Sequence, residues 1–344
     1  MSLDQRIKSL VAVRNVLDQF LNKKYVDSQT YSEFKNLISL AEIKNPWFTE
    51  KSILSVLTYW NSVLTEETLT NWLSNYAIKF NKSKLIGLVL AGNIPMVGFH
   101  DCISTLLTGN QAKIKLSSKD SVLIPFLLNL WKEFCKDLEF EFVEKLPHCD
   151  AVITTGTTNT AKYFEYYFKN IPHIIRKNRT SIAIINGNET KEDLLGIADD
   201  IFTYFGLGCR SVTQLFIPVN YDLKPLFNVF IFYKDCINHS KYSNNYEYNK
   251  AIYLMNQEKF WDNNFILLKE SRNLFSPIGT LYFSTYYDNS ELANFISQNT
   301  DYLQCIVSAQ PFDRFKTVLP GQAQNPKIND YADGVDILEF LTNL

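Results

Sequence analysis

One cysteine stands where a nucleophile could work. Cys209 lies in the stretch GLGCRSVTQLFIP, between Gly208 and Arg210 and just before an apolar run that predicts a strand. Glycines beside the thiol leave room for a substrate carbonyl, and the arginine next to it could stabilise a thiolate. Attack of that thiolate on a carbonyl would give a covalent acyl enzyme. The alternative is a small buried residue, which is the common fate of a free cysteine.

A side-chain amide lies at another position suited to catalysis. Asn93 belongs to AGNIPMVG, which follows an apolar run and precedes a helix-like segment that begins with Pro95. At the carboxyl edge of a sheet, such an amide could stabilise a developing oxyanion. Proline suits the first turn of a helix, and asparagine often caps one. Taken alone, this motif favours the cap.

Two further strand ends carry groups suited to a nucleotide. In KIKLSSKD, Lys115 is followed by Ser117 and Ser118, which are donors for a ribose or a phosphate. In TTGTTNTAK, a strand runs into Gly156 and Thr157 and then into a helix, whose first N–H groups favour anions. The alternatives are a solvated lysine with serines that start a helix, and an ordinary threonine cap. Neither stretch contains the G-x-G-x-x-G of the standard Rossmann fingerprint.

Alternating strands and helices must position these residues. Residues 3–80 have apolar positions at three- and four-residue steps, which predicts helices. From residue 84, short apolar runs alternate with helix-like segments, and such β-α-β units predict mostly parallel sheets that bind ligands at the strands' carboxyl ends. We expect four parts: an N-terminal helical segment over 1–83, a dinucleotide-binding α/β domain over 84–205, a catalytic α/β domain over 206–310 and a C-terminal tail over 311–344 that returns to the first lobe.

Composition argues against several classes of partner and site. The chain has 344 residues, and 34 Lys and Arg residues almost balance 36 Asp and Glu residues, so we expect no nucleic-acid partner. The longest apolar stretch, residues 85–99, is too short to span a bilayer, and the charged N-terminus is unlike a secretory signal. Six dispersed cysteines and four dispersed histidines predict reduced thiols and no metal site. We therefore expect a cytoplasmic protein without a membrane span.

The order of these motifs resembles that of the aldehyde dehydrogenase superfamily. Strands ending in G-N-I-P, K-L-S-S and T-G-T-T are followed by one cysteine at a junction between two lobes. Within the superfamily, LTGNQAKIKLSSKDS and PGQAQNPKINDYADGVDILEFL look like the LuxC-type acyl-CoA reductases, the fatty-acid reductases of bacterial luminescence. This similarity covers residues 84–344, and the N-terminal helices match less specifically. It implies an α/β fold with two parallel-sheet lobes and an N-terminal helical segment.

The resemblance also implies roles for the residues. Cys209 matches the nucleophile, and Asn93 matches the asparagine whose amide forms an oxyanion hole with the cysteine N–H. Lys115 matches the lysine that contacts the adenine ribose of the cofactor. Gly156 and Thr157 match the small residues over which the pyrophosphate and nicotinamide pass. A homo-oligomer is expected from the resemblance alone.

Two departures from the superfamily pattern narrow the chemistry. Hydrolytic aldehyde dehydrogenases carry a basic glutamate before the strand expected at 181–185, whereas this chain has no Asp or Glu between Glu165 and Glu189. Loss of a general base slows water attack by ~10²–10⁴-fold, so an acyl enzyme should survive to meet CoA or hydride. NAD-preferring relatives often hold a glutamate three residues after the lysine. Here Ser118 and Lys119 would instead accept a 2′-phosphate, which predicts NADPH rather than NADH.

The resemblance, together with these two departures, implies NADPH-dependent reduction of an acyl thioester to the aldehyde through a thioester on Cys209, with fatty acyl-CoA as the expected substrate. The first alternative is a CoA-acylating aldehyde dehydrogenase that oxidises an aldehyde to acyl-CoA with NAD. Two others are a cysteine acyltransferase or hydrolase without redox chemistry, and a pair of lobes kept only to bind a partner. The acyl chain length stays open. The C-terminal GQAQNP and DYADGVD motif either closes over the active site or forms a structured tail on the nucleotide lobe.

Overall fold

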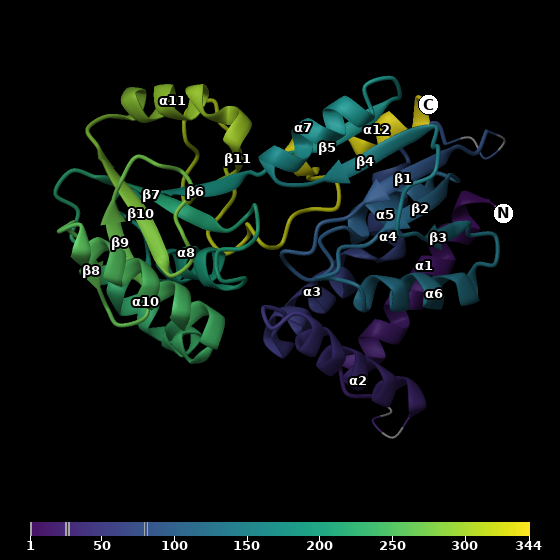
Figure 1. The fold of residues 1–344 in the computed structure, drawn as a ribbon, viewed down its shortest axis with the longest axis horizontal. Coiled ribbons are helices and arrows are strands. Elements are labelled where there is room, and N and C mark those ends of the chain that lie inside the picture. Colours follow the sequence, from purple (N-terminus) through teal and green to yellow (C-terminus); the bar gives the residue numbers. More distant parts are fainter. Residues whose placement is uncertain (1, 25, 27, 79, 81) are drawn as a thin grey trace. The chain divides into compact units, whose positions relative to one another are not determined.

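The computed structural model describes residues 2–24, 26, 28–78, 80 and 82–344, and the chain forms two compact units. The first unit comprises Met1–Lys177 and Lys327–Leu344, and the second comprises Asn178–Pro326. Each unit has its own sheet with helices packed around it (Figure 1). This confirms the predicted α/β class.

The first unit contains a sheet of five parallel strands in the order β3-β2-β1-β4-β5. The strands are β1 (Leu85–Val89), β2 (Gln111–Lys115), β3 (Phe140–Phe142), β4 (Ala151–Thr155) and β5 (His173–Arg176). Helices α5 (Phe99–Leu107), α6 (Leu123–Phe134) and α7 (Thr158–Tyr167) connect them. Apolar strands such as LIGLV suit a parallel sheet, because helices cover its faces. The β-α-β alternation in the sequence therefore predicts this part of the fold correctly.

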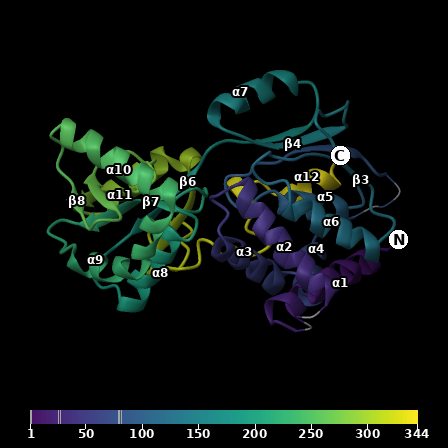
Figure 2. The same cartoon turned by 60° about the horizontal axis from the view of Figure 1, so that its bottom comes forward.

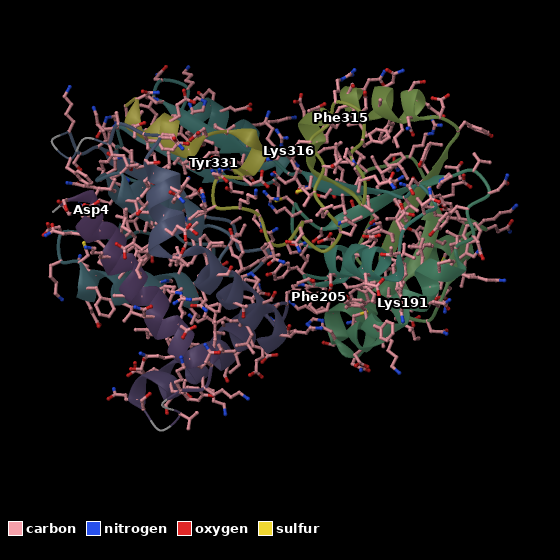
Figure 3. All side chains as sticks on the ribbon, turned by 180° about the vertical axis from the view of Figure 1, so that it is seen from behind. Asp4, Lys191, Phe205, Phe315, Lys316 and Tyr331 are labelled. Carbon is pink, nitrogen blue, oxygen red and sulfur yellow. The ribbon has the colours of Figure 1, made fainter. Side chains whose placement is uncertain are left out.

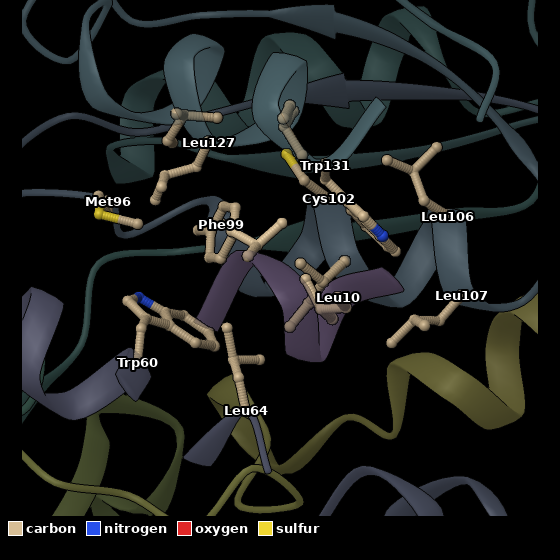
Figure 4. Packing of buried hydrophobic residues seen from close by; sticks show 14 of the residues in the cluster. Leu10, Trp60, Leu64, Met96, Phe99, Cys102, Leu106, Leu107, Leu127 and Trp131 are labelled. Carbon is tan, nitrogen blue, oxygen red and sulfur yellow. The ribbon is translucent and has the colours of Figure 1, made fainter. Parts of the chain in front are cut away.

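The described residues of the N-terminal segment form four helices, as its apolar spacing predicts. They are α1 (Leu3–Leu21), α2 (Gln29–Lys44), α3 (Glu50–Val63) and α4 (Glu66–Leu73). Serine or threonine side chains cap all four N-termini. Helix α1 packs against α3 and α6, and these helices share one hydrophobic core with the sheet (Figures 2 and 4). The helical segment thus belongs to the first compact unit.

The second unit contains a six-stranded sheet in the order β11-β6-β7-β10-β9-β8. Its strands are β6 (Thr180–Ile184), β7 (Val212–Pro218), β8 (Trp261–Asp262), β9 (Leu267–Glu270), β10 (Thr280–Tyr286) and β11 (Leu303–Ser308), and only β8 pairs antiparallel among the described pairs. Its α-helices are α8 (Lys191–Phe202), α9 (Lys224–Phe230), α10 (Ser240–Met255) and α11 (Asn289–Gln298). This unit also contains the 3₁₀ helices Ile231–Asn238 and Thr300–Tyr302. The chain then returns to the first unit, where it forms the 3₁₀ helix Ala332–Gly334 and the C-terminal α12 (Ile337–Thr342).

Two features of the second unit differ from the sequence-based expectation. Strand β6 and helix α8 were expected in the domain over 84–205, but β6 pairs with β7 and β11. The chain therefore passes from the first unit to the second at Lys177–Asn178. The sequence did not predict this boundary, because apolar spacing indicates a strand but not the strands with which it pairs. The stretch SKYSNNYEYN has the polar composition typical of a loop, yet it begins α10. Tyr242, Tyr246 and Tyr253 lie at helical spacing and are buried along one face.

The C-terminal DYADGVD motif is a structured tail on the first unit. Tyr331 accepts a hydrogen bond from Trp72 Nε1 at 2.8 Å, and its hydroxyl lies 2.8 Å from that of Tyr76. Tyr76 donates to Asp336 Oδ2 at 2.5 Å. Figure 3 shows Tyr331 on this segment. Helix α12 then buries Ile337 in the core of the same unit.

The GQAQNP part of the motif stays with the second unit. The backbone N–H groups of Gly321 and Ala323 donate to the Asp200 carboxylate at 2.8 and 3.1 Å. Burial raises the pKa of Asp200 to about 7. Gly196 allows this close approach, because a Cβ there would lie 2.6 Å from the carbonyl carbon of Pro320. The expected return of the tail thus begins at Lys327 rather than at residue 311.

A buried ion pair ties α5 to β5 within the first unit. Arg176 Nη1 lies 2.6 Å from Asp101 Oδ2, and the two side chains are only 8% and 4% exposed. Removing one partner of a buried pair leaves an uncompensated charge, which costs about 3–5 kcal/mol. We expect Arg176→Leu to lower the free energy of unfolding by that amount in urea denaturation. The double variant Asp101→Leu/Arg176→Leu should recover most of the loss, and a single variant as stable as the wild type would contradict this account.

Candidate functional site

The AGNIPMVG stretch forms a loop between β1 and α5, and Asn93 on it is exposed. Helix α5 begins at Phe99 rather than at Pro95, because Met96 has a φ of 56° that a right-handed helix cannot accommodate. The N-cap of α5 is Gly98, with no side-chain hydrogen bond. The interpretation of Asn93 as the cap of this helix is therefore wrong.

The sheet register brings three of the proposed motifs to one edge. Val89, the last residue of β1, pairs with Lys115 at the end of β2 and with Thr154 near the end of β4. The segments that follow these strands carry Asn93 and Gly156, besides the serines after β2. Ligands of parallel α/β sheets bind outside this carboxyl edge. The first unit therefore gathers six of the seven sequence-predicted site residues.

The segment after β2 presents its polar groups in a tight turn. Lys115 is exposed, and its Nζ donates to the Glu144 carbonyl oxygen at 2.7 Å. The Ser117 hydroxyl accepts a hydrogen bond from Lys119 N at 3.3 Å, and Ser118 is exposed at the tip of the turn. Helix α6 starts later, at Leu123, with Val122 as its N-cap. The serines therefore do not cap the helix, and the exposed groups can reach a ligand.

The segment after β4 begins a helix with its N–H groups at the same edge. Gly156 N donates to the Arg176 carbonyl oxygen at 3.2 Å. Thr157 is the N-cap of α7, and its hydroxyl accepts from Thr160 N at 3.3 Å. Thr157 is thus the cap that the alternative interpretation describes. The cap and anion binding are compatible, because the positive end of the α7 dipole stays at this edge.

Cys209 lies in the second unit, in the turn between α8 and β7, and it is half-buried. Its carbonyl oxygen accepts a hydrogen bond from the Ser181 hydroxyl at 3.0 Å. The Ser211 hydroxyl accepts from Gly208 N at 3.3 Å, and Ser211 N donates back to the Gly208 carbonyl at 3.0 Å. Two serines thus fix the backbone of this turn on both sides of the thiol. Sequence reasoning missed Ser181, because nothing in its apolar strand separates it from an ordinary strand serine.

The other cysteines are poorer nucleophile candidates. Four of them, Cys102, Cys135, Cys149 and Cys305, are buried. Burial raises the pKa of the Cys102 and Cys149 thiols above the ordinary value, and it raises that of the half-buried Cys236 to about 12. A thiol with a raised pKa is scarcely ionised at neutral pH, so it attacks a carbonyl slowly.

Arg210 contacts the sulfur of a cysteine that is distant in sequence. Its Nη1 donates to Cys305 Sγ at 3.1 Å. Cys305 N in turn donates to the Ser181 hydroxyl at 3.1 Å, and that same hydroxyl holds the carbonyl of Cys209. A hydrogen-bond network therefore supports the Cys209 turn through Arg210, Cys305 and Ser181. The sequence did not predict this network, because its members are distant from one another along the chain.

Two further observations concern other kinds of site. Within the described parts of the chain, no three His, Cys, Asp or Glu side chains are grouped so that they could hold a metal ion. No helix among the described residues is both long and apolar enough to cross a membrane.

Solved structures similar to this chain share the aldehyde dehydrogenase fold. Aldehyde dehydrogenase 21 from Physcomitrella patens, solved with the reaction product succinate, is 10% identical, with a TM-score of 0.68 and coverage of 100% of this chain and 84% of that one. An NAD-dependent benzaldehyde dehydrogenase from Corynebacterium glutamicum is 10% identical, with a TM-score of 0.64 and coverage of 90% and 76%. An aldehyde dehydrogenase from Mycobacterium tuberculosis, solved with NAD⁺, is 10% identical, with a TM-score of 0.62 and coverage of 90% of this chain and 73% of that one. These likenesses confirm the predicted fold.

The sequence itself matches a family of reductases. No curated protein sequence matches the chain. The model of the acyl-CoA reductase (LuxC) family matches residues 18–225, a stretch that includes most of the N-terminal helices, the three strand-end motifs and Cys209. This match spans more than half of the 344 residues and confirms the resemblance found in the three strand-end motifs and at Cys209, while the C-terminal motif lies outside the matched residues. The chain belongs to the acyl-CoA reductase (LuxC) family, and it is an oxidoreductase that acts on acyl or aldehyde groups.

Proposed function

We propose that the protein reduces an acyl thioester, with fatty acyl-CoA as the substrate, to the aldehyde, and that Cys209 carries the acyl group. The observation that most supports this proposal is the sheet register of the first unit. In a chain of the acyl-CoA reductase family, Val89 pairs with both Lys115 and Thr154, so an amide, an exposed lysine and a helix N-terminus share one carboxyl edge.

The residues at this edge fit a nicotinamide dinucleotide. Lys115 and Ser118 are exposed donors for the ribose, and the N-terminus of α7 suits a pyrophosphate. Gly156 keeps the approach to that helix open, since a Cβ there would already lie 3.1 Å from Thr160 Cβ. When bound, the cofactor supplies the hydride. Lys115, Ser117, Ser118, Gly156 and Thr157 would hold it.

The chain's own groups would then act on the acyl carbon. The Cys209 thiolate attacks the thioester carbonyl, and the oxyanion accepts hydrogen bonds from the Asn93 amide and the Cys209 N–H. Collapse of this intermediate breaks the bond to CoA, whose thiolate takes up a proton, and leaves an acyl thioester on Cys209. After reduction of that carbonyl, the same donors hold the thiohemiacetal oxygen. Its collapse releases the aldehyde and restores the Cys209 thiolate.

Water should compete poorly for the acyl enzyme. No Asp or Glu lies between Glu165 and Glu189, the part of the chain where hydrolytic aldehyde dehydrogenases place their base. Without that base, hydrolysis is slower by ~10²–10⁴-fold. The thioester on Cys209 would therefore last until hydride arrives.

We further propose that NADPH is the preferred cofactor, because exposed Ser118 and Lys119 follow Lys115 where a glutamate would repel a 2′-phosphate. Ser118→Glu should raise the KM for NADPH by about 10-fold or more, since like charges in contact cost several kcal/mol. The KM for NADH should change little. Steady-state kinetics with both cofactors measures the ratio of the KM for NADPH to the KM for NADH, with Ser118→Ala as the matched control. A wild type that prefers NADH, or a ratio unchanged in Ser118→Glu, would contradict NADPH preference.

The direct test is the loss of reduced-nicotinamide absorbance when the protein meets NADPH and a panel of acyl-CoAs. Oxidation that requires the thioester, with aldehyde recovered, is the expected result. Faster turnover of aldehyde, CoA and NAD⁺ would favour the oxidative direction. Acylation of Cys209 without any redox reaction would overturn the proposal in favour of a cysteine acyltransferase.

A further inference from the structure

Asp120 is a buried carboxyl that the proposed reaction does not use. It ends the turn that follows β2, and it is only 3% exposed. Its Oδ2 accepts a hydrogen bond from the backbone N–H of Met96 at 2.7 Å. Met96 lies three residues after Asn93, so this bond joins the loop that carries the proposed oxyanion donor to the turn after β2.

Met96 needs a partner that holds it in place. Its φ of 56° lies in the left-handed region, which non-glycine residues adopt only when their surroundings fix them. Its side chain is 1% exposed and belongs to the core cluster that includes Phe99 and Trp60 (Figure 4). The core therefore holds the side chain of Met96, and Asp120 holds its N–H.

A second contact joins the same two segments on the other side of Asn93. A Cβ at Gly92 would lie 2.6 Å from Ser117 Oγ and 3.0 Å from Asp120 N. The loop and the turn thus meet at Gly92, directly before Asn93, and again at Met96. The backbone around Asn93 is fixed at both ends by one turn.

We propose that Asp120 is a positioning residue, which fixes the Asn93 loop to the turn carrying Ser117 and Ser118 so that the amide is in place before the substrate arrives. This inference rests on the proposed role of Asn93. The turn itself does not depend on the Asp120 side chain, because Asp120 N donates to the Ser117 carbonyl at 3.1 Å whatever residue stands there. Loss of the carboxyl should therefore displace the loop that carries Asn93 and leave the turn that carries Ser117 and Ser118 intact.

The acceptor oxygen of Asp120 matters more than its charge. Burial raises the pKa of Asp120 to about 7, so the carboxyl is partly protonated at neutral pH. Asparagine keeps an oxygen acceptor of the same reach without a charge. Asp120→Asn should therefore act like the wild type, whereas Asp120→Ala leaves the buried Met96 N–H without its acceptor.

The test is the rate at which acyl-CoA acylates Cys209 in the absence of nicotinamide, followed by intact-protein mass spectrometry. We expect Asp120→Ala to slow acylation by about 10–100-fold, because small misplacements of a catalytic group have effects of that size. The acylation rate of Asp120→Asn should stay within about threefold of the wild-type rate. The NADPH dissociation constant should also stay within about threefold of the wild-type value in both Asp120→Ala and Asp120→Asn. Asp120→Ser, whose oxygen is one atom shorter, should also slow acylation and replaces the alanine variant if that one does not fold. Equal acylation rates in all variants would overturn the inference.

A double variant shows whether Asp120 acts through Asn93. Asn93→Ala/Asp120→Ala should be no slower than Asn93→Ala alone, because the loop no longer carries the amide that Asp120 positions. Multiplied losses in the double variant would mean that Asp120 acts on its own, which would overturn the inference.

Ser9→Ala is the matched control for general destabilisation. It removes the acceptor of the buried Trp131 N–H, which donates to Ser9 Oγ at 2.8 Å between α1 and α6. Acylation should keep its wild-type rate in this variant, and an equal slowing would attribute the Asp120 effect to stability. If even the wild type is not acylated, the proposed function fails. Faster hydrogen exchange at the Met96 N–H in Asp120→Ala, but not in Asp120→Asn, would still support the positioning role of Asp120, and unchanged exchange would refute it.

Discussion

Cys209→Ala should abolish NADPH oxidation driven by acyl-CoA, with kcat lower by on the order of 10⁴-fold or more, as for loss of other covalent nucleophiles. Alanine cannot form the thioester, so no carbonyl is held for reduction. The change removes one half-buried sulfur from a turn whose backbone is fixed by Ser181 and Ser211. We therefore expect normal folding and normal NADPH binding, measured by thermal melting and by fluorescence titration.

Cys236→Ala is the matched control for this prediction. Cys236 is also half-buried and also lies in the second unit, but burial raises its pKa to about 12. This variant should keep wild-type turnover. Loss of activity in Cys236→Ala together with retained activity in Cys209→Ala would show that Cys236, and not Cys209, is the nucleophile.

Asn93→Ala should lower kcat by about 10²–10³-fold, which is the usual effect of removing one oxyanion donor. The side chain is exposed and does not cap α5, so its loss should leave the fold and the NADPH dissociation constant unchanged. Single-turnover kinetics should locate the defect in the acylation of Cys209. The effect arises because the donor stabilises charge that develops only in the transition state.

An exposed asparagine elsewhere in the first unit provides the control for Asn93. Asn71 lies in α4, and Asn71→Ala should retain full activity. If Asn93→Ala turned over acyl-CoA as fast as Asn71→Ala, the Asn93 amide would have no part in the oxyanion hole.

The sequence predicts the parallel sheet and the edge that carries the strand-end motifs, because both follow from local patterns. Short apolar strands that alternate with helices must be joined by crossovers, and parallel strands end at one edge. That is why the strand-end motifs could be expected at one carboxyl edge, whereas the register that pairs Val89 with Lys115 and Thr154 comes from the structure. The family resemblance in the strand-end motifs supplied the expected roles of these residues.

The remaining features depend on contacts between distant residues. Strand β6 has the same apolar character as β4, so its place in the second sheet could not be deduced from the sequence. The bond from Met96 N to Asp120 requires a left-handed residue that no pattern signals. Ser181 holds Cys209 across 28 positions, and nothing in the strand sequence distinguishes it.

Trapping of the acyl enzyme is the most direct test of the central claim, that Cys209 carries the acyl group that becomes the aldehyde. The protein is mixed with acyl-CoA without nicotinamide, and intact-protein and peptide mass spectrometry are used to locate the adduct. We predict one acyl group on the peptide containing Cys209, released as aldehyde when NADPH is added. An acyl group on another residue, or its release only as the free acid, would contradict the account.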